Sequence, residues 1–283
     1  MPYIIPVEDR ISTYPGRVTL TPVSGEANTY DLKRADMPII DGTPVNKKLF
    51  DSKADAMTEE AVVYVSPSGN DLAGDGTVDT PYATIQKALD SIPKNLNGHT
   101  VTIDIASGTY EERVAVNGFI GGKLKIGVQG RSVVIRGFAI SGCSFVETNI
   151  SNITKSSGFS GAFYFVDKGS SVLIASAMKI EGSNASDSGI SATTGSTVYA
   201  ASNVTLTISN CYGAAVQADL CSFVSVDKIL GDNNIIGVSA VRGSIVSYNT
   251  QTMTNMWGNN AASGGLVLTG SNSSSLSGAT LDL

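Results

Sequence analysis

The feature that most constrains the fold is a set of valines that recur at a nearly constant interval through the second half of the chain. They are Val146, Val172, Val198, Val224 and Val246, at offsets of 26, 26, 26 and 22 residues. Two more apolar columns keep these offsets: Phe138, Tyr164, Ile190, Val216 and Val238, and Ile140, Val166, Ala192, Ala218 and Ala240. Repeats of about 20–50 residues built from short alternating strands indicate a solenoid, because stacked coils share a core that no single coil can bury.

Turn residues keep the register of the valines. Three positions before each valine stands a small residue followed by serine: Cys143, Gly169, Gly195, Cys221 and Gly243. A β-sandwich is the alternative, since strand and turn spacing alone does not separate the two architectures. Three apolar columns in one register favour stacked coils. Cys143 and Cys221 then lie three coils, or ~14 Å, apart, beyond disulfide reach, and we expect free thiols near turns.

Composition narrows the classes of partner. The 283 residues include 42% hydrophobic and only 16% charged side chains, with a formal net charge of −6. No stretch is strongly basic, which argues against a nucleic-acid partner. The N-terminal MPYIIPVEDR lacks the basic flank and apolar core of a signal peptide, and no apolar run reaches the ~18 residues of a membrane span. We therefore expect no membrane attachment, and release by lysis or within a larger particle.

Three zones differ along the chain. Residues 1–60 contain six prolines within the first 44 positions and a polar stretch over 51–60, which favours an extended attachment segment and linker. Residues 61–112 are predicted to form an N-terminal cap, with strands at 62–65 and 101–105 and an amphipathic helix over 82–91. Residues 113–283 carry the repeats and are predicted to form the solenoid.

The cap zone also carries a family resemblance. Residues 64–71 (YVSPSGND), 75–76 (DG) and 80–88 (TPYATIQKA), followed by 105–110 (IASGTY) and 114–116 (VAV), resemble the opening of pectate-lyase-like right-handed parallel β-helix proteins. In that family a first strand and a short amphipathic helix cap the open end of the solenoid. The resemblance implies an all-β, right-handed parallel β-helix with an N-terminal capping helix. It does not imply an activity, because this fold hosts lyases, hydrolases, esterases and inert adhesins.

The first zone resembles a different group of proteins. Residues 13–23 (TYPGRVTLTPV), 28–32 (NTYDL) and 42–47 (GTPVNK) look like the start of tail-fibre or baseplate-associated proteins of phages and prophages. The resemblance implies a particle-attachment segment, a homotrimer, and a virion or phage-tail-like particle as the location of a protein made in the bacterial cytoplasm without a signal peptide. The matching positions that would contact tail or baseplate proteins are Tyr14, Pro15, Gly16, Arg17, Tyr30, Asp31 and Asn46.

One pair of acids is spaced for glycoside hydrolysis. Asp167 and Asp219 share a phase of the repeat with Thr193 between them, so two coils place them ~9.6 Å apart. Inverting enzymes hold their two carboxylates ~6.5–9.5 Å apart. The alternative, which we favour, is that both are solvated acids beside turns, where Asp is common.

Other chemistries lack the residues they need. Calcium needs several clustered oxygens, whereas the sequence predicts ion pairs between the neighbours Asp167–Lys168 and Asp227–Lys228. His99 is the only histidine and lies far in sequence from any Ser or Cys nucleophile, which argues against a catalytic triad. We expect no metal and no cofactor.

Aromatic side chains offer a saccharide platform without cleavage. Trp257, the sole tryptophan, stands among Asn and Gly in the turn-like stretch 255–260 (NMWGNN), and Tyr248 is predicted to accompany it. Tyr199 and Tyr212 are further candidates. The alternative is that Trp257 fills a gap at a subunit interface or at the end of the solenoid.

These features favour a structural or adhesion component of a phage tail or tail-like particle. Residues 1–60 would anchor the chain, and the β-helix would face outward, with host cell-surface polysaccharide as a candidate partner. A non-enzymatic role is favoured. A tailspike-type polysaccharide depolymerase, acting through hydrolysis or elimination, and an internal spacer of the baseplate are the alternatives.

Overall fold

The computed structural model describes residues 11–12, 18–22, 30–34, 38–40, 56–154, 161–182 and 188–269. The chain divides into two compact units, residues 2–54 and 55–283. The first unit contains two antiparallel pairs. One joins β1 (Ile11–Ser12) to β4 (Pro38–Ile40), and the other joins β2 (Val18–Pro22) to β3 (Tyr30–Arg34).

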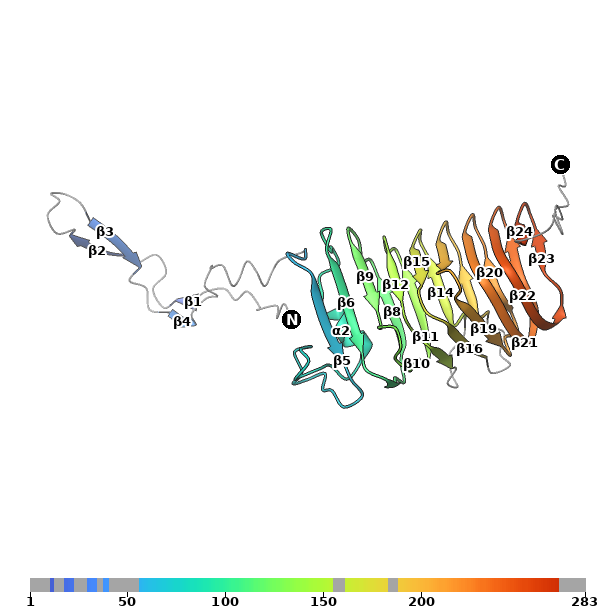
Figure 1. Cartoon of the computed structure of the whole chain (residues 1–283). Helices are drawn as coiled ribbons and strands as arrows, with labels where there is room; N and C mark the ends of the chain where they lie inside the picture. Colours follow the sequence, from blue (N-terminus) through green and yellow to red (C-terminus); the bar gives the residue numbers. More distant parts are fainter. Residues whose placement is uncertain are drawn as a thin grey trace. The chain divides into compact units, whose positions relative to one another are not determined.

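The second unit is a parallel β-solenoid of about seven coils, as the repeats predict (Figure 1). Each strand pairs with the equivalent strand of the next coil. The strands are β5 (Ala61–Val65), β6 (Thr100–Ile105), β7 (Gly108–Thr109), β8 (Arg113–Asn117), β9 (Lys123–Ile126), β10 (Val133–Ile135), β11 (Gly137–Ser141), β12 (Val146–Thr148), β13 (Asn152–Thr154), β14 (Tyr164–Asp167), β15 (Ser171–Ile174), β16 (Met178–Glu181), β17 (Ile190–Ala192), β18 (Thr197–Ala200), β19 (Thr205–Ser209), β20 (Ala214–Ala218), β21 (Phe223–Val241), β22 (Ile245–Trp257), β23 (Asn260–Ala262) and β24 (Leu266–Thr269).

The predicted valine column is confirmed. Parallel registers place Val146, Val172, Val198, Val224 and Val246 side by side, and all five side chains are fully buried. The same column extends back through Leu124 and Val101 to Ala61 and continues to Val267. The two other apolar columns also pair coil by coil and are buried. Successive side chains of a strand point to opposite faces, so every second side chain points into the shared interior.

The turns before Val172, Val198, Val224 and Val246 share one backbone conformation, which Ser263–Gly264 before Val267 repeats. In these four turns two successive residues have positive φ, and the second is glycine in three: Lys168–Gly169, Thr194–Gly195, Leu220–Cys221 and Arg242–Gly243. A buried serine follows each corner: Ser170, Ser196, Ser222 and Ser244. The amide N–H of Ser196 donates to Ser222 Oγ at 3.1 Å, and that of Ser222 donates to Ser244 Oγ at 3.0 Å. The serines thus carry hydrogen bonds from coil to coil. Cys143 and Cys221 are free thiols, as predicted.

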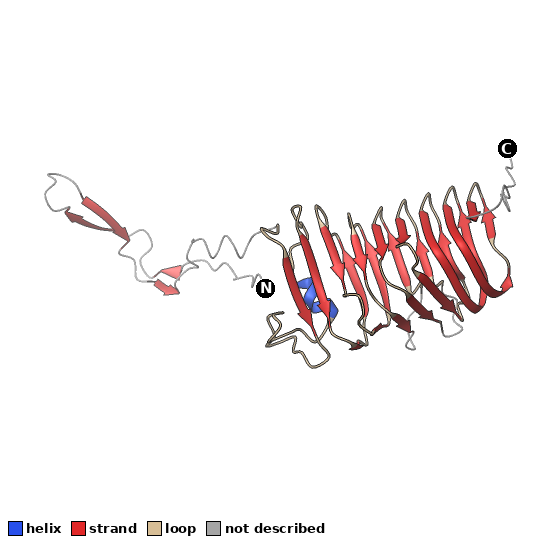
Figure 2. Cartoon of the chain, viewed as in Figure 1, coloured by secondary structure: helices blue, strands red, loops and turns tan. Residues whose placement is uncertain are grey.

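A short helix closes the N-terminal end of the solenoid. Helix α2 (Ile85–Asp90) lies beside β5 and β6 (Figure 2) and buries Ile85, Ala88 and Leu89. It is shorter than the predicted 82–91 because Thr84 adopts an extended conformation and caps it, accepting from the Lys87 N–H. The capping helix implied by the resemblance is therefore present.

The C-terminal end is closed by polar side chains. In the inward column that contains Leu206 and Ile229, the next position is Gln251. Its side-chain amide exchanges two hydrogen bonds with that of Asn259, at 3.0 and 3.2 Å. Asn259 also donates to the Tyr248 hydroxyl at 2.8 Å. In this column the apolar interior ends on amides, whereas the valine column ends on the buried Val267.

Candidate ligand-binding groove

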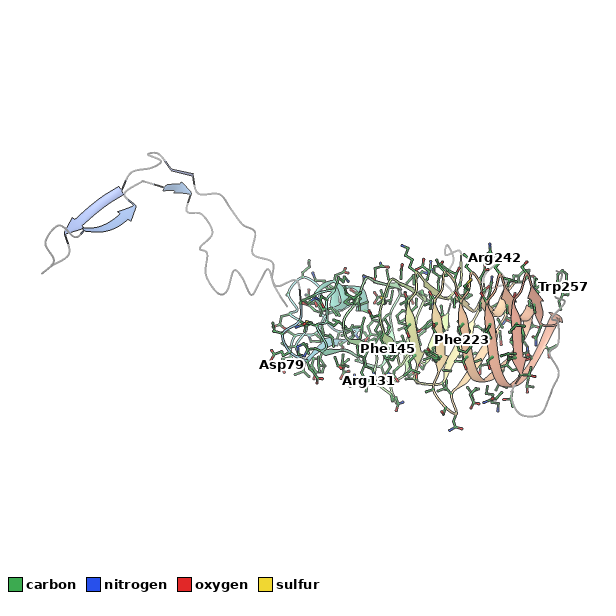
Figure 3. All side chains as sticks on the ribbon, turned by 90° about the horizontal axis from the view of Figure 1, so that it is seen from above. Asp79, Arg131, Phe145, Phe223, Arg242 and Trp257 are labelled. Atoms are coloured by element: carbon green, nitrogen blue, oxygen red, sulfur yellow. The ribbon has the colours of Figure 1, made fainter. Side chains whose placement is uncertain are left out.

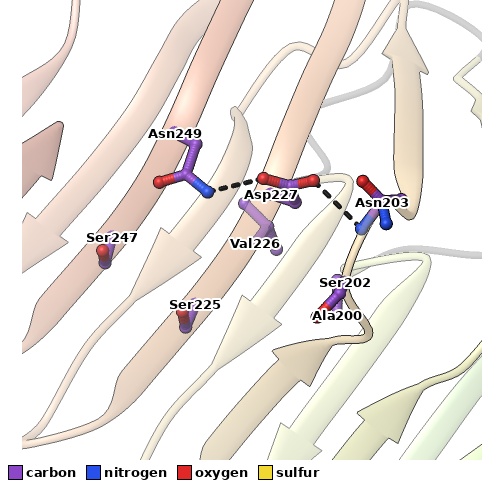
Figure 4. Close-up of a pocket in the computed structure, with 8 residues that line it drawn as sticks. All are labelled: Ala200, Ser202, Asn203, Ser225, Val226, Asp227, Ser247 and Asn249. Carbon is purple, nitrogen blue, oxygen red and sulfur yellow. Dashed lines mark hydrogen bonds between the residues drawn. The ribbon is translucent and has the colours of Figure 1, made fainter. Parts of the chain in front are cut away.

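A polar groove crosses successive coils on the outside of the solenoid, where β18, β21 and β22 follow one another (Figure 4). Its lining residues are Ala200, Ser202, Asn203, Ser225, Val226, Asp227, Ser247 and Asn249. Three serine hydroxyls, two amides and one carboxylate are therefore gathered from segments about 22–26 residues apart. The pairing of strands that places Val224 beside Val246 also places the outward-facing residues of the two coils side by side, for example Ser225 beside Ser247.

Asp227 is the central side chain of the groove. One carboxylate oxygen accepts the Asn249 Nδ2–H at 2.5 Å, and the other accepts the Asn203 backbone N–H at 3.0 Å. Figure 4 shows the carboxylate held between these two partners, one from each neighbouring coil. An ionised carboxylate has about four acceptor sites. Two of them stay open to a ligand.

The predicted ion pair between Asp227 and Lys228 is not found. Within the described part of the chain, the ion pairs of the solenoid join other residues, and Asp227 accepts its hydrogen bonds from nitrogen donors of two asparagines. Val226 and Ile229 on either side are buried, so Asp227 and Lys228 both lie at the surface, where asparagines of the neighbouring coils bind the carboxylate. Asp167 and Lys168 likewise form no ion pair among the described residues.

Aromatic side chains flank the groove. Tyr199 is 40% exposed and is the strand neighbour of Ser225. Its ring contacts that of Phe223 at 6.3 Å between centroids, which fixes its orientation. One strand spacing across and two residues along the strand separate Tyr199 from Asp227, or ~8 Å between Cα atoms. Tyr199 is not among the lining residues, and its ring packs beside Phe223, on the other side of Ser225 along the strand from Asp227.

The two predicted catalytic acids, Asp167 and Asp219, have different surroundings. Asp219 receives a hydrogen bond at 2.6 Å from Arg242 Nε on the next coil, and this guanidinium lowers the pKa of its carboxyl. A carboxyl held ionised is unsuited to act as the acid that protonates a leaving group. Asp167 lies on β14, and its Oδ1 is buried with no hydrogen-bond partner in the residues described. Thr193 lies between them, as the repeat phase predicts.

The two predicted platform residues do not share a surface. Trp257 is 67% exposed at the far end of the solenoid (Figure 3), whereas Tyr248 is 6% exposed and bonded to Asn259. Burial raises the pKa of the Tyr248 hydroxyl. Tyr212, at 49% exposed, is a surface residue on a different turn.

Most of the predicted attachment residues fall outside the described part of the chain. Tyr30 and Asp31 lie in β3, paired with β2. The others, Tyr14, Pro15, Gly16, Arg17 and Asn46, lie outside the described residues. Their role stays a prediction.

Sequence reasoning singled out Tyr199 but missed the polar members of the groove. A usable signal existed, because Ser225 and Ser247, and Asp227 and Asn249, are separated by the same 22 residues as Val224 and Val246. Aligning the outward-facing residues with the offset of the valines would have placed Ser225 beside Ser247 and Asp227 beside Asn249.

The described residues offer no metal site, because no group of three or more of their His, Cys, Asp or Glu side chains is arranged to hold a metal ion. The same residues include no helix with the length and hydropathy needed to traverse a membrane. No protein-family model, curated protein or solved structure matches the chain.

Proposed function

We propose that this protein is an adhesion component of a phage tail or tail-like particle, and that the Asp227 groove binds saccharide on the host surface. Residues 1–60 would attach the chain to tail or baseplate proteins. The observation that supports saccharide binding is the groove itself, in which hydroxyls, amides and a carboxylate from successive coils come together.

The chemistry of the groove fits a saccharide. Serine hydroxyls and asparagine amides both donate and accept hydrogen bonds, as sugar hydroxyls do. The exposed face of Tyr199 offers an apolar surface with a polar tip. Most of the lining side chains stand on paired strands, and Ser202 and Asn203 lie in the short turn after β18, which preorganises the groove and lowers the cost of binding. The run of equivalent coils suits an extended polymer.

A co-sedimentation assay tests the binding half. Purified protein is mixed with insoluble host cell-wall polysaccharide, and the bound fraction is measured together with new reducing ends and unsaturated sugars. We expect binding that Asp227→Ala and Tyr199→Ala each reduce at least fivefold, without product. Asp232→Ala, which removes an exposed acid beside Thr254 further along β21, is the matched control.

The same assay decides between the alternatives. Product formation that is abolished by Asp167→Asn would favour the depolymerase and overturn a purely adhesive role. Failure to bind wall polysaccharide at any concentration would remove the saccharide ligand from the proposal.

Particle attachment needs a separate experiment. Antibody labelling of purified particles should place the chain on the tail, and deletion of residues 1–60 should remove it from the particle. Host adsorption that stays intact after deletion of residues 61–283 would favour the internal spacer instead.

A further inference from the structure

The Asp227 carboxylate lies in the groove without a cationic partner among the described residues, whereas five other acids of the solenoid have one. The acids that do have such a partner form the pairs Asp104–Arg131, Glu111–Arg136, Glu147–Lys123, Glu181–Lys179 and Asp219–Arg242. The partners of Asp227 are an amide N–H and a backbone N–H, which carry no net charge. The negative charge in the groove is therefore stabilised by dipoles and is not neutralised.

We propose that this carboxylate is a subsite for a protonated amine, so that the groove prefers an amino-bearing saccharide to a neutral or acidic one. This inference rests on the proposed saccharide-binding function and names the class of ligand. A glucosamine unit with a free amine is the simplest example. Its ammonium would occupy the open acceptor sites of Asp227 in a charge-assisted hydrogen bond, which is shorter and stronger than a neutral one.

The surroundings supply the remaining contacts. Ser225 and Ser247 lie in adjacent outward positions before Asp227 and Asn249, so sugar hydroxyls next to the amine would meet serine hydroxyls. Tyr199, the neighbour of Ser225, would contact the apolar face of the ring. A polyuronate would bring carboxylates against Asp227 in a chain whose net charge is −6, and like charges at this range disfavour binding.

The experiment compares three soluble ligands of equal length by titration calorimetry, near pH 6 and at low salt. They are an oligomer of glucosamine, the same oligomer N-acetylated, and an oligogalacturonate. Near pH 6 an aliphatic amine is protonated and an ordinary Asp carboxyl is ionised. We expect the glucosamine oligomer to bind about five- to tenfold more tightly than the acetylated one, and the oligogalacturonate most weakly. Salt near 0.5 M should shrink the preference, because it screens a partly exposed charge pair.

Two variants and one control identify the residues. Asp227→Asn keeps the shape and an acceptor oxygen, and it should abolish the preference for the amine. Tyr199→Ala should weaken both glucosamine oligomers equally and leave the preference unchanged. Asp232→Asn changes the net charge by the same amount as Asp227→Asn and should have no effect. Unchanged thermal unfolding of each variant shows that the fold is intact.

The outcomes separate this inference from the proposed function. Equal binding of the two glucosamine oligomers, or a preference that survives Asp227→Asn, overturns the amine subsite. Wall polysaccharide would still bind in the sedimentation assay, so saccharide adhesion would stand. Absence of binding both to the oligomers and to the wall material removes both proposals.

Discussion

Replacing Cys221 by glycine should stabilise the solenoid. Cys221 occupies the second position of a corner at which the equivalent coils place Gly169, Gly195 and Gly243, and its φ is 60°. A residue with a Cβ in this left-handed region costs roughly 1–2 kcal/mol. Glycine offsets part of the gain, about 0.4–1 kcal/mol, because it increases the conformational entropy of the unfolded chain.

The expected net gain is about 0.5–1 kcal/mol in the free energy of unfolding. No close packing opposes it: Cys221 is exposed, and its thiol makes a weak hydrogen bond from Sγ to the Arg242 carbonyl at 3.8 Å. The reverse change, Gly195→Cys, is the matched control. A Cβ at Gly195 would meet no atom within 4 Å, so backbone strain alone should lower the stability by a similar amount.

Urea unfolding followed by far-ultraviolet circular dichroism measures both changes under reducing conditions. The midpoint should rise for Cys221→Gly and fall for Gly195→Cys, with an unchanged m-value. The melting temperature should move by about 1–4 °C in the same directions. A Cys221→Gly variant that is less stable than the parent, together with a neutral Gly195→Cys variant, would refute the reasoning from left-handed corners.

Three further predictions test the core, the closed end and the acid response. Val198→Ala, in the middle of the buried column, should lower the free energy of unfolding by about 2–3 kcal/mol, and a loss under 0.5 kcal/mol in urea unfolding would contradict a dry column. The double change Gln251→Leu with Asn259→Val replaces the polar closure of the last coil by apolar groups. It should cause concentration-dependent self-association in size-exclusion chromatography with light scattering, and a monodisperse variant of unchanged mass would count against an end closed by amides. Folding lowers the pKa of the Asp219 carboxyl beside Arg242. The ion pair therefore stabilises the fold at any pH above the pKa of this carboxyl in the unfolded chain, near 3.8. This stabilisation is lost as the pH falls through the lower pKa of the folded protein. Arg242→Ala should flatten the loss of stability below pH ~4, and identical acid unfolding curves for variant and parent would disprove the coupling.

The sequence was sufficient for the coil architecture because every coil repeats the same physical requirement. Val146 and Val224 are buried for one reason, since each lies at the inward phase of a strand whose neighbours in both directions are apolar. That requirement is local and periodic, so it is visible in a single sequence. The helix at 85–90 was visible for a similar reason, through its apolar spacing, whereas its cap at Thr84 was not predicted and the helix was placed over 82–91.

The contact between Asp227 and Asn203 in the groove depended on information that periodicity does not contain. Asp227 finds Asn249 at the regular offset of 22 residues but meets the backbone of Asn203 at 24, because the corners that join the strands differ in length from coil to coil. Arg242 reaches Asp219 for the same reason, across 23 residues. Sequence adjacency wrongly paired Asp227 with Lys228, because asparagines of the two neighbouring coils bind the carboxylate instead.

The sequence by itself determined that the chain stacks into parallel coils with one interior, because burial repeats with the coil. Only the tertiary structure decided which outward side chains meet, and that decision leaves the charge of Asp227 without a cation among the described residues. The physical reason is that inward positions are selected by a common apolar environment, whereas outward contacts depend on the individual path of each corner.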